Sequence, residues 1–289
     1  MKVLLTGATG YIGGHIGSKL VALGHEVVSL TRDKKQSVDF DTKLIEMADL
    51  SLEKGIQAVI HLAGASVADK KWTAEYKRTL VSSRIAFTHR ILRELDYEDL
   101  EVFLQASAIG FYQSSGDRIL TEDSESGNSF LSKLCLDWEE TTENLECRKA
   151  YFRIGMVLGK ESPAMKKMVP LFKSRKGAAL GSGKQYMSWI HIDDLSQMFI
   201  DALEDYDYSG VYNAVSPNPI TNKEFTREMA LAVGKSVWLP SAPSFILKML
   251  YGEMSQILLD SHRVEPRNLK LKGKSFKYDK VDEALRASI

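Results

Sequence analysis

Short, nearly continuous apolar runs alternate along the chain with longer stretches that repeat apolar residues at helical spacing. Runs that predict strands are Val3–Thr6, Glu26–Leu30, Ala58–Leu62, Val102–Ala106, Tyr151–Arg153 and Val211–Ala214. Because these runs lack a polar alternation, we expect strands that are buried on both faces. Strands that alternate with helices form a parallel sheet with helices on each side. The pattern therefore predicts an α/β fold with a doubly wound parallel sheet.

The first predicted strand runs into a glycine-rich turn, Gly7-x-x-Gly10-x-x-Gly13, and a helical stretch follows from Tyr11 to about Leu23. Gly7 permits a tight exit from the strand, Gly10 leaves room for a pyrophosphate, and Gly13 allows the helix to pack closely. The first N–H groups of such a helix point at bound phosphates. A purely structural turn is the alternative. The predicted cofactor contacts of this loop are Gly7, Thr9, Gly10, Tyr11, Ile12 and Gly13.

The pattern changes after about Leu158. Met165–Gly183 is basic and glycine-rich, and we interpret it as a mobile or ligand-contacting segment. Ser188–Leu195 opens a helix, and the last fifty residues are amphipathic and helical. We expect a smaller, mostly helical lobe over the carboxyl edge of the sheet, where ligands of such folds bind. The predicted nucleotide-binding lobe is 1–160 and 186–216, and the substrate lobe is 161–185 and 217–289.

Composition narrows the function classes. The 289 residues contain 38 Lys plus Arg and 38 Asp plus Glu, which argues against a nucleic-acid or anionic-membrane surface. No apolar run is long enough to span a bilayer, and the N-terminus does not resemble a signal peptide. Cys135 and Cys147 are too few for a disulfide framework. We expect a cytoplasmic protein that acts on a small molecule and has no metal site.

The end of the second predicted strand bears on the choice of dinucleotide. An NAD site usually has an acidic residue there to bind the ribose 2′-hydroxyl, but this chain has Thr31 followed by Arg32. An arginine can pair with the 2′-phosphate of NADP. Asp33 keeps NAD(H) open as the less favoured cofactor, and a solvated loop of charges is the remaining alternative. The predicted cofactor is NADP(H), with Thr31 and Arg32 among its contacts.

Several segments together resemble the NAD(P)-dependent epimerase/dehydratase family, the extended branch of the short-chain dehydrogenase/reductase superfamily. Besides the glycine loop, these segments are Val59–Ser66, Gln105–Tyr112 and Ser188–Leu195. An atypical subgroup, known only as "epimerase family protein", is resembled further in Lys71–Lys77, Ser83–Ile85, Leu120–Asp123, Phe130–Leu131, Trp138–Glu139, Leu180–Gly183 and Gly252–Met254. The resemblance covers nearly the whole chain.

This resemblance implies a Rossmann lobe with a discontinuous substrate lobe, in which Val211–Ala214 returns to the sheet. It also implies that the loop after the third predicted strand passes under the adenosine and its ribose. The small residues of that loop suit a close approach. Its predicted cofactor contacts are Leu62, Ala63 and Gly64. For the substrate the resemblance implies nothing specific.

The chain lacks the proton-transfer pair of most superfamily members. Those enzymes use Tyr-x-x-x-Lys on one helix face, where the lysine lowers the tyrosine pKa. None of the 11 tyrosines here is followed four positions later by lysine. In the helix Phe130–Glu139, one alignment places Leu131 and Cys135 at the pair's positions, and a second places Ser129 and Lys133 there. Any catalysis therefore needs other groups.

Replacement groups are few. Ser107 matches the family's active-site serine within one residue, and Tyr112 lies on the same loop, so these two are the candidate catalytic residues. Trp72 and Lys77 are candidates for the substrate pocket. Each has a structural alternative, such as a packed aromatic for Tyr112 and a lobe anchor for Trp72. His61 is interpreted as a buried core histidine.

Two functions are compatible with these observations. One is an NADP(H)-dependent oxidoreductase or epimerase acting on a small polar molecule, with a sugar-nucleotide-like substrate as one option. The other is an NADP(H)-sensing or binding protein without turnover, which the missing pair favours. A homodimer whose cofactor merely stabilises the fold is a third, weaker hypothesis.

Overall fold

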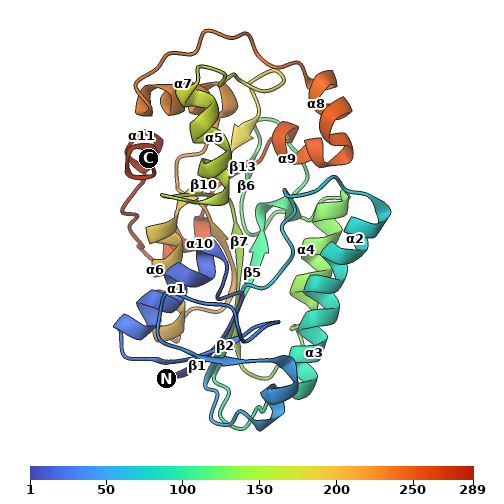
Figure 1. The fold of residues 1–289 in the computed structure, drawn as a ribbon, viewed down its shortest axis with the longest axis vertical. Coiled ribbons are helices and arrows are strands. Elements are labelled where there is room, and N and C mark those ends of the chain that lie inside the picture. The colour runs from blue at the N-terminus through green and yellow to red at the C-terminus, as the bar shows by residue number, and fades with distance from the viewer.

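A seven-stranded parallel sheet forms the centre of the molecule in the computed structural model, which describes all 289 residues (Figure 1). The strand order is β11-β7-β5-β4-β1-β2-β3, which confirms the predicted doubly wound sheet. The strands are β1 (Lys2–Thr6), β2 (Glu26–Leu30), β3 (Lys43–Ile45), β4 (Ala58–His61), β5 (Val102–Ala108), β7 (Arg148–Ile154) and β11 (Gly210–Ala214). The apolar pattern did not predict β3, because a three-residue strand is too short to show one.

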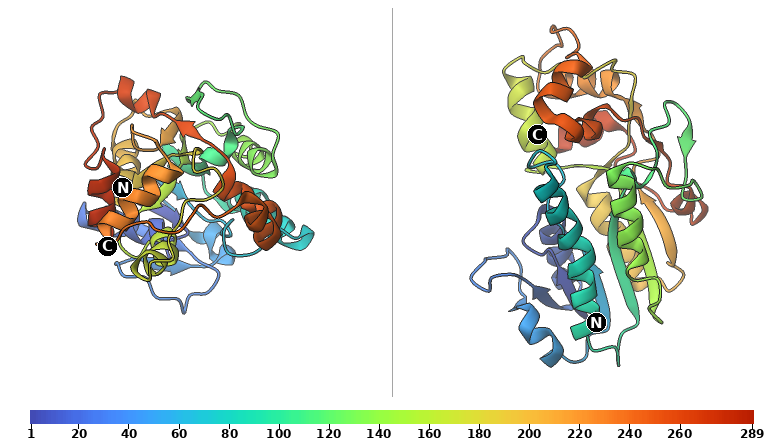
Figure 2. Two further views of the ribbon diagram at one scale, coloured as in Figure 1. Left: turned by 90° about the horizontal axis from the view of Figure 1, so that it is seen from above. Right: turned by 90° about the vertical axis from the view of Figure 1, so that its right-hand side faces the viewer.

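Helices cover both faces of the sheet (Figures 1 and 2). One face carries α1 (Tyr11–Ala22) and α6 (Ile192–Glu204), and the other carries α2 (Ala74–Val81), α3 (Phe87–Glu94) and α4 (Phe130–Glu140). An apolar cluster lies on each face of the sheet. Because successive strand residues point to opposite faces, alternate side chains of β1 belong to different clusters. Val3 and Leu5 belong to the cluster under α1 and α6, and Leu4 belongs to the cluster under α3.

A smaller, largely helical layer lies over the carboxyl edge of the sheet (Figure 1). Its elements are α5 (Pro163–Lys173), α7 (Asn222–Ala232), α8 (Ser244–Tyr251), η4 (Gly252–Ser255), α9 (Gln256–Leu259) and α11 (Val281–Ala287), while α10 (Arg267–Leu271) lies beside β11. Three strand pairs connect the layer: β8 (Met156–Leu158) with β10 (Trp189–His191), β9 (Tyr186–Met187) with β12 (Ile220–Thr221), and β6 (Ile119–Leu120) with β13 (Arg263–Val264). None of the helices is both long and apolar enough to cross a membrane.

Two segments of the chain are described further by the structure. Met165–Gly183, interpreted as a mobile or ligand-contacting segment, contains the helix α5 in its first half. Ser162 caps that helix by accepting the Met165 N–H. Phe172 is buried in the apolar cluster of the smaller layer, together with Phe225 and Leu285. The segment Ser188–Leu195 first forms the short strand β10, and α6 begins at Ile192.

Polar contacts at the start of α6 join the two parts of the chain. His191 Nδ1 accepts the N–H of Asp193 at 3.2 Å. The Asp194 carboxylate accepts the backbone N–H groups of Lys277 and Tyr278 at 2.6 and 3.1 Å. These residues therefore orient the helix against the C-terminal segment.

Candidate functional site

The strand order reverses between β1 and β4, and ligands of open α/β sheets bind in the crevice at such a point. The N-terminus of α1 opens into this crevice. Its N-cap, Gly10, has no side chain, and no acidic residue lies in the first turn. No group of the chain accepts a hydrogen bond from the backbone N–H of Tyr11 or Ile12. The helix end therefore keeps free donors and its positive dipole, which fit a pyrophosphate.

Two glycines bring the loops around this helix end together. Gly7 has φ of +76°, and a Cβ added to it would lie 3.1 Å from the backbone nitrogen of Ala63. A Cβ on Gly13 would lie only 2.1 Å from the Gly7 carbonyl oxygen. The loop after β1 is therefore packed against both α1 and the loop after β4, with no space for side chains between them.

The side chain of Tyr11 points away from the phosphate site. A Cβ on Gly159 would lie 2.3 Å from the Tyr11 hydroxyl, so the phenol packs against the segment before α5. The hydroxyl is buried without a hydrogen-bond partner, and burial raises the pKa of Tyr11 to about 12. At this position the backbone N–H is free, the hydroxyl is covered, and the residue as a whole is half-buried.

The end of β2 presents a free cation. Arg32 is exposed and makes no hydrogen bond or ion pair within the chain. Asp33, which complicates the sequence interpretation, turns its carboxylate into the loop, where it accepts the Lys35 N–H at 2.8 Å. Lys34 pairs with Asp49 at 2.7 Å. Among these loop residues Arg32 is thus well suited to bind an added phosphate.

The loop after β4 is fixed by a buried chain of hydrogen bonds. Thr6 Oγ1 lies 2.8 Å from His61 Nδ1 and accepts the N–H groups of Leu62 and Ala63, each at 3.1 Å. His61 Nε2 lies 2.9 Å from the Thr88 hydroxyl. Burial lowers the pKa of His61 to about 3, so its ring is neutral. These contacts confirm that His61 is a core histidine that positions the predicted cofactor loop.

In the alignment that gives the positions of the catalytic pair to Leu131 and Cys135, both side chains are apolar. Leu131 packs in a cluster with Trp72 and with Met254 of η4. One turn later Cys135 is buried, and burial raises the pKa of its thiol to about 11. Neither side chain can exchange a proton near neutral pH, so the structure adds no acid–base pair at these positions.

Ser107 and Tyr112 belong to one buried polar network. The Ser107 hydroxyl donates to Glu139 at 2.5 Å. Arg153 binds both carboxylate oxygens of Glu139, at 3.0 and 2.8 Å, and also donates to the Tyr112 hydroxyl at 3.0 Å. The Tyr112 hydroxyl donates to Asn213 Oδ1 at 2.7 Å. The network thus connects β5, α4, β7 and β11 at the carboxyl edge.

Both candidate catalytic hydroxyls are covered by protein. Ser107 is 4% exposed and Tyr112 is 1% exposed. Burial, partly offset by Arg153, raises the pKa of Tyr112 to about 12. The geometry gives both residues a structural role, and proton transfer by either stays a prediction that requires the side chain to move. Sequence analysis assigned Glu139 and Arg153 no role in this network. For Glu139 a usable signal was its place on the helix face of Cys135, whereas Arg153 shares its strand with Arg148 and Lys149 and does not stand out.

Trp72 and Lys77, the predicted pocket residues, link the helices after β4 to the upper layer. Trp72 is buried, and its indole N–H donates to the Val67 carbonyl at 2.9 Å. Lys77 Nζ lies 2.6 Å from Glu253 in η4. Trp72 is therefore a packed anchor in this structure, whereas Lys77 reaches the rim of a cavity.

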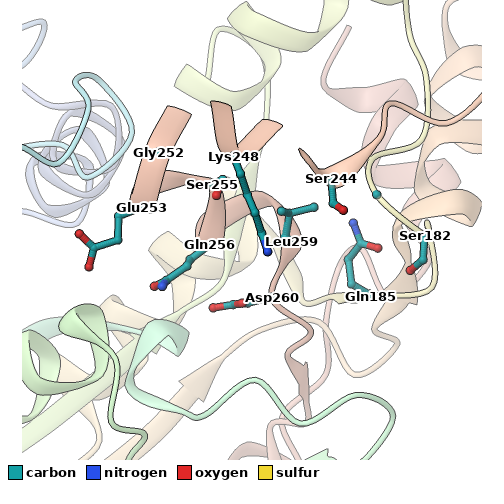
Figure 3. A pocket seen from close by; sticks show the side chains of 11 residues that line it. Ser182, Gln185, Ser244, Lys248, Gly252, Glu253, Ser255, Gln256, Leu259 and Asp260 are labelled. Atoms are coloured by element: carbon teal, nitrogen blue, oxygen red, sulfur yellow. The ribbon is translucent and has the colours of Figure 1, made fainter. Parts of the chain in front are cut away.

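That cavity has a volume of about 650 Å³ and lies in the upper layer. Figure 3 shows Lys248 of α8, Gln256 of α9, Asp260 just after α9, and Ser182 and Gln185 from the segment after α5. Only one of its lining residues, Leu259, is hydrophobic. Burial raises the pKa of Asp260. The lining suits a polar ligand. Its residue Glu253 forms an ion pair with Lys77 of α2, one of the helices that cover the sheet.

Comparisons with known proteins agree with this geometry. A family model described as the NAD dependent epimerase/dehydratase family matches residues 3–215, and a domain of unknown function, DUF1731, matches residues 242–288. The chain is 36% identical over 301 residues to the chloroplastic epimerase family protein SDR39U1 homolog of Arabidopsis thaliana, covering 99% of this chain and 86% of that protein. It is 33% identical over 300 residues to epimerase family protein YfhF of Bacillus subtilis, covering 99% and 97%.

Solved structures show the same fold. Human epimerase family protein SDR39U1 (isoform 2), crystallised with NADPH, superposes with a TM-score of 0.91 at 28% identity and covers 99% of this chain and 98% of that one. UDP-glucose 4-epimerase of Thermotoga maritima superposes with a TM-score of 0.76 at 17% identity, covering 100% and 97%, which shows the fold alone.

Proposed function

Because the chain belongs to the NAD-dependent epimerase/dehydratase family, we propose that it binds NADP(H) and acts as an oxidoreductase or epimerase on a small polar molecule. The observation that carries the proposal is the uncapped N-terminus of α1 at the point where the strand order reverses. The exposed, unpaired Arg32 at the end of β2 supports the phosphorylated cofactor. The human relative with NADPH supports the same choice.

In this proposal, different parts of the cofactor contact different residues along the carboxyl edge of the sheet. Arg32 would bind the 2′-phosphate beyond β2, and the free N–H groups of α1 would bind the pyrophosphate. The nicotinamide half would then extend over the loop after β4 toward β5. When bound, the nicotinamide supplies hydride exchange. Leu131 and Cys135 would exclude water at that end, since neither carries a charge there.

Replacing Arg32 tests the cofactor. In fluorescence titrations, Arg32→Ala should weaken NADPH binding by about tenfold to a hundredfold, the worth of a charged hydrogen bond. Binding of NADH should barely change. Arg90→Ala, which removes another exposed arginine from α3, is the matched control. Equal losses for both cofactors, or tighter binding of NADH by the unmodified protein, would refute the assignment.

The polar cavity supports a polar substrate. Its lining of hydroxyl, amide and charged groups can bind a molecule rich in hydroxyl or phosphate groups, and an apolar ligand would leave these groups unpaired. The test is a screen of carbonyl compounds and sugar nucleotides with NADPH absorbance as the readout. An active substrate should lose affinity when Lys248→Ala removes the cavity's cation, while cofactor binding is retained.

A second function, cofactor binding without turnover, is favoured by the lack of an acid–base pair. The pair's positions hold Leu131 and Cys135 in one alignment and Ser129 and Lys133 in the other, and neither set contains a tyrosine. The hydroxyls of Ser107 and Tyr112 are engaged in the buried network. Tight NADPH binding with no hydride exchange across the whole panel would favour this function. Turnover of any member of the panel would exclude it.

A further inference from the structure

The cavity of the smaller layer contains two opposite charges that do not pair with each other. Lys248 lies on α8, and Asp260 follows α9, so they come from separate segments of the lining. Figure 3 shows the Lys248 ammonium and the Asp260 carboxylate directed into the cavity. The one ion pair of the lining joins Glu253 to Lys77, at 2.6 Å. Lys248 and Asp260 are therefore both available to a ligand.

The carboxylate of Asp260 is half-buried and accepts no hydrogen bond from the chain. The backbone N–H of this residue donates to the Gln256 carbonyl at 2.9 Å, but no donor or cation reaches the side chain. Burial raises the pKa of the Asp260 carboxyl, and His262 opposes that rise only in part. His262 Nε2 instead lies 3.1 Å from the Tyr112 carbonyl. A carboxylate in such a place is costly, and a donor on a ligand would offset the cost.

The buried amide of the lining adds an acceptor to this carboxylate. The Gln185 side-chain nitrogen donates to the Leu180 and Leu258 carbonyls, at 2.9 and 3.1 Å, so both of its N–H groups are engaged. The amide oxygen of Gln185 stays free to accept. Lys248 is the only cation of the lining, and it is exposed. The cavity therefore offers acceptors to a donor on the ligand and one ammonium group to an anion.

The cavity adjoins the end of the crevice toward which the nicotinamide would extend. Met254 of η4, next to the lining residue Glu253, packs in one cluster with Leu131 of α4. A Cβ on Gly110, just after β5, would lie 3.4 Å from the Leu131 side chain. Contacts through Met254 and Leu131 thus join the cavity to the carboxyl end of β5. This position suits the substrate of the proposed reaction.

We propose that the cavity binds a small molecule that carries both an ammonium group and an anionic group, with the ammonium on Asp260 and the anion on Lys248. This class of substrate deepens the proposed function and rests on it. Asp260 determines the specificity, because a ligand without a cation would leave its half-buried charge unpaired. Lys248 contributes less, since its ammonium is exposed to solvent. A sugar nucleotide without an amine would bring only negative charge to Asp260.

The test uses four probes that differ only in these two groups. Glucosamine 6-phosphate carries both charges, glucose 6-phosphate carries only the anion, glucosamine carries only the ammonium, and glucose carries neither. Their dissociation constants are measured at neutral pH, by ligand-observed NMR titration, for the unmodified protein, Asp260→Asn and Lys248→Met. Asp279→Asn and Lys173→Met are the matched controls, because each removes an exposed charge that does not line this cavity.

We expect glucosamine 6-phosphate to bind about tenfold or more tightly than glucose 6-phosphate, the worth of a charged hydrogen bond. Asp260→Asn should abolish this preference for the amine and keep the preference for the phosphate. Lys248→Met should weaken only the two phosphates, by about twofold to fivefold. Both controls should match the unmodified protein. Equal binding of the two phosphates, an amine preference that survives Asp260→Asn, or no detectable binding of any probe would overturn the proposal.

A crystal structure of the unmodified protein with glucosamine 6-phosphate tests the proposal even if a variant does not fold. The amine nitrogen should lie within about 3.2 Å of an Asp260 carboxylate oxygen, with the phosphate toward Lys248. An amine bound away from Asp260 would overturn the proposal. None of these measurements needs the cofactor. Failure of the unmodified protein to bind NADPH would instead refute the proposed function and leave the binding of the four probes unchanged, so the two failures are distinguishable.

Discussion

Adding one methyl group at Gly13 should separate α1 from the phosphate loop. A Cβ there would lie 2.1 Å from the Gly7 carbonyl oxygen and 2.8 Å from its carbon, so the backbone itself must shift by more than 1 Å, against a contact of about 3.5 Å. Overpacking of this kind costs about 1–3 kcal/mol. Alanine offsets about 1 kcal/mol through its helix propensity. We expect Gly13→Ala to lower the free energy of unfolding by up to about 2 kcal/mol.

The next residue provides the control. A Cβ on Gly14 would meet its nearest atom, the Ala8 carbonyl oxygen, at 3.9 Å, which is an ordinary contact. Gly14→Ala should therefore gain up to about 1 kcal/mol from helix propensity alone. Urea unfolding followed by far-UV circular dichroism would measure both variants. Because the gain in helix propensity is the same for both variants, the difference between them should equal the cost of overpacking, about 1–3 kcal/mol in favour of Gly14→Ala.

Cofactor binding gives a second readout for the same pair. Displacement of the loop removes the alignment of the free N–H groups at Tyr11 and Ile12, so Gly13→Ala should weaken NADPH binding more than tenfold. If Gly13→Ala is as stable as Gly14→Ala and binds NADPH equally well, then the close packing of α1 on Gly7 does not position the free N–H groups, and the reasoning is refuted.

Three further outcomes follow from the buried groups. Glu139→Gln leaves the Arg153 guanidinium buried without its anion, so it should lower the free energy of unfolding in urea by about 3–5 kcal/mol. Glu140→Gln, on the exposed side of α4, should lower it by almost nothing. Similar unfolding midpoints for the two variants would contradict the pairing of Glu139 with Arg153. Tyr112→Phe should cost about 1–3 kcal/mol with NADPH affinity unchanged, and a loss of turnover without a loss of stability would instead support the predicted catalytic role. The pKa of His61 is about 3 in the folded state and 6.5 in the unfolded state, so between these values only the unfolded state binds the extra proton. Stability should therefore fall as the pH drops below about 6.5. A protonated His61 ring in NMR spectra of the folded protein at about pH 5 would contradict this.

Local patterns in the sequence determined the fold class and the cofactor loop. Strands such as Glu26–Leu30 and Val211–Ala214 were predicted almost to the residue, because strands buried on both faces are short, continuous apolar runs. The glycine spacing was equally informative, since a strand-to-helix turn around a phosphate constrains neighbouring positions only. The absence of a Tyr-x-x-x-Lys pair is likewise a property of five consecutive positions on a helix.

Contacts between distant segments were decided by the tertiary structure alone. Ser107 and Tyr112 suggested one catalytic loop, but Ser107 lies in β5 and Tyr112 follows it. Glu139 and Arg153 from other elements form hydrogen bonds with their hydroxyl groups. Arg84 shows the reverse case, because nothing local distinguishes it from exposed arginines such as Arg90. Only the tertiary structure brings its guanidinium, in the π-helical turn Ser82–Ala86, beside Gly64 and Trp138. Burial and pairing depend on which elements the topology brings together, and local sequence spacing does not encode them.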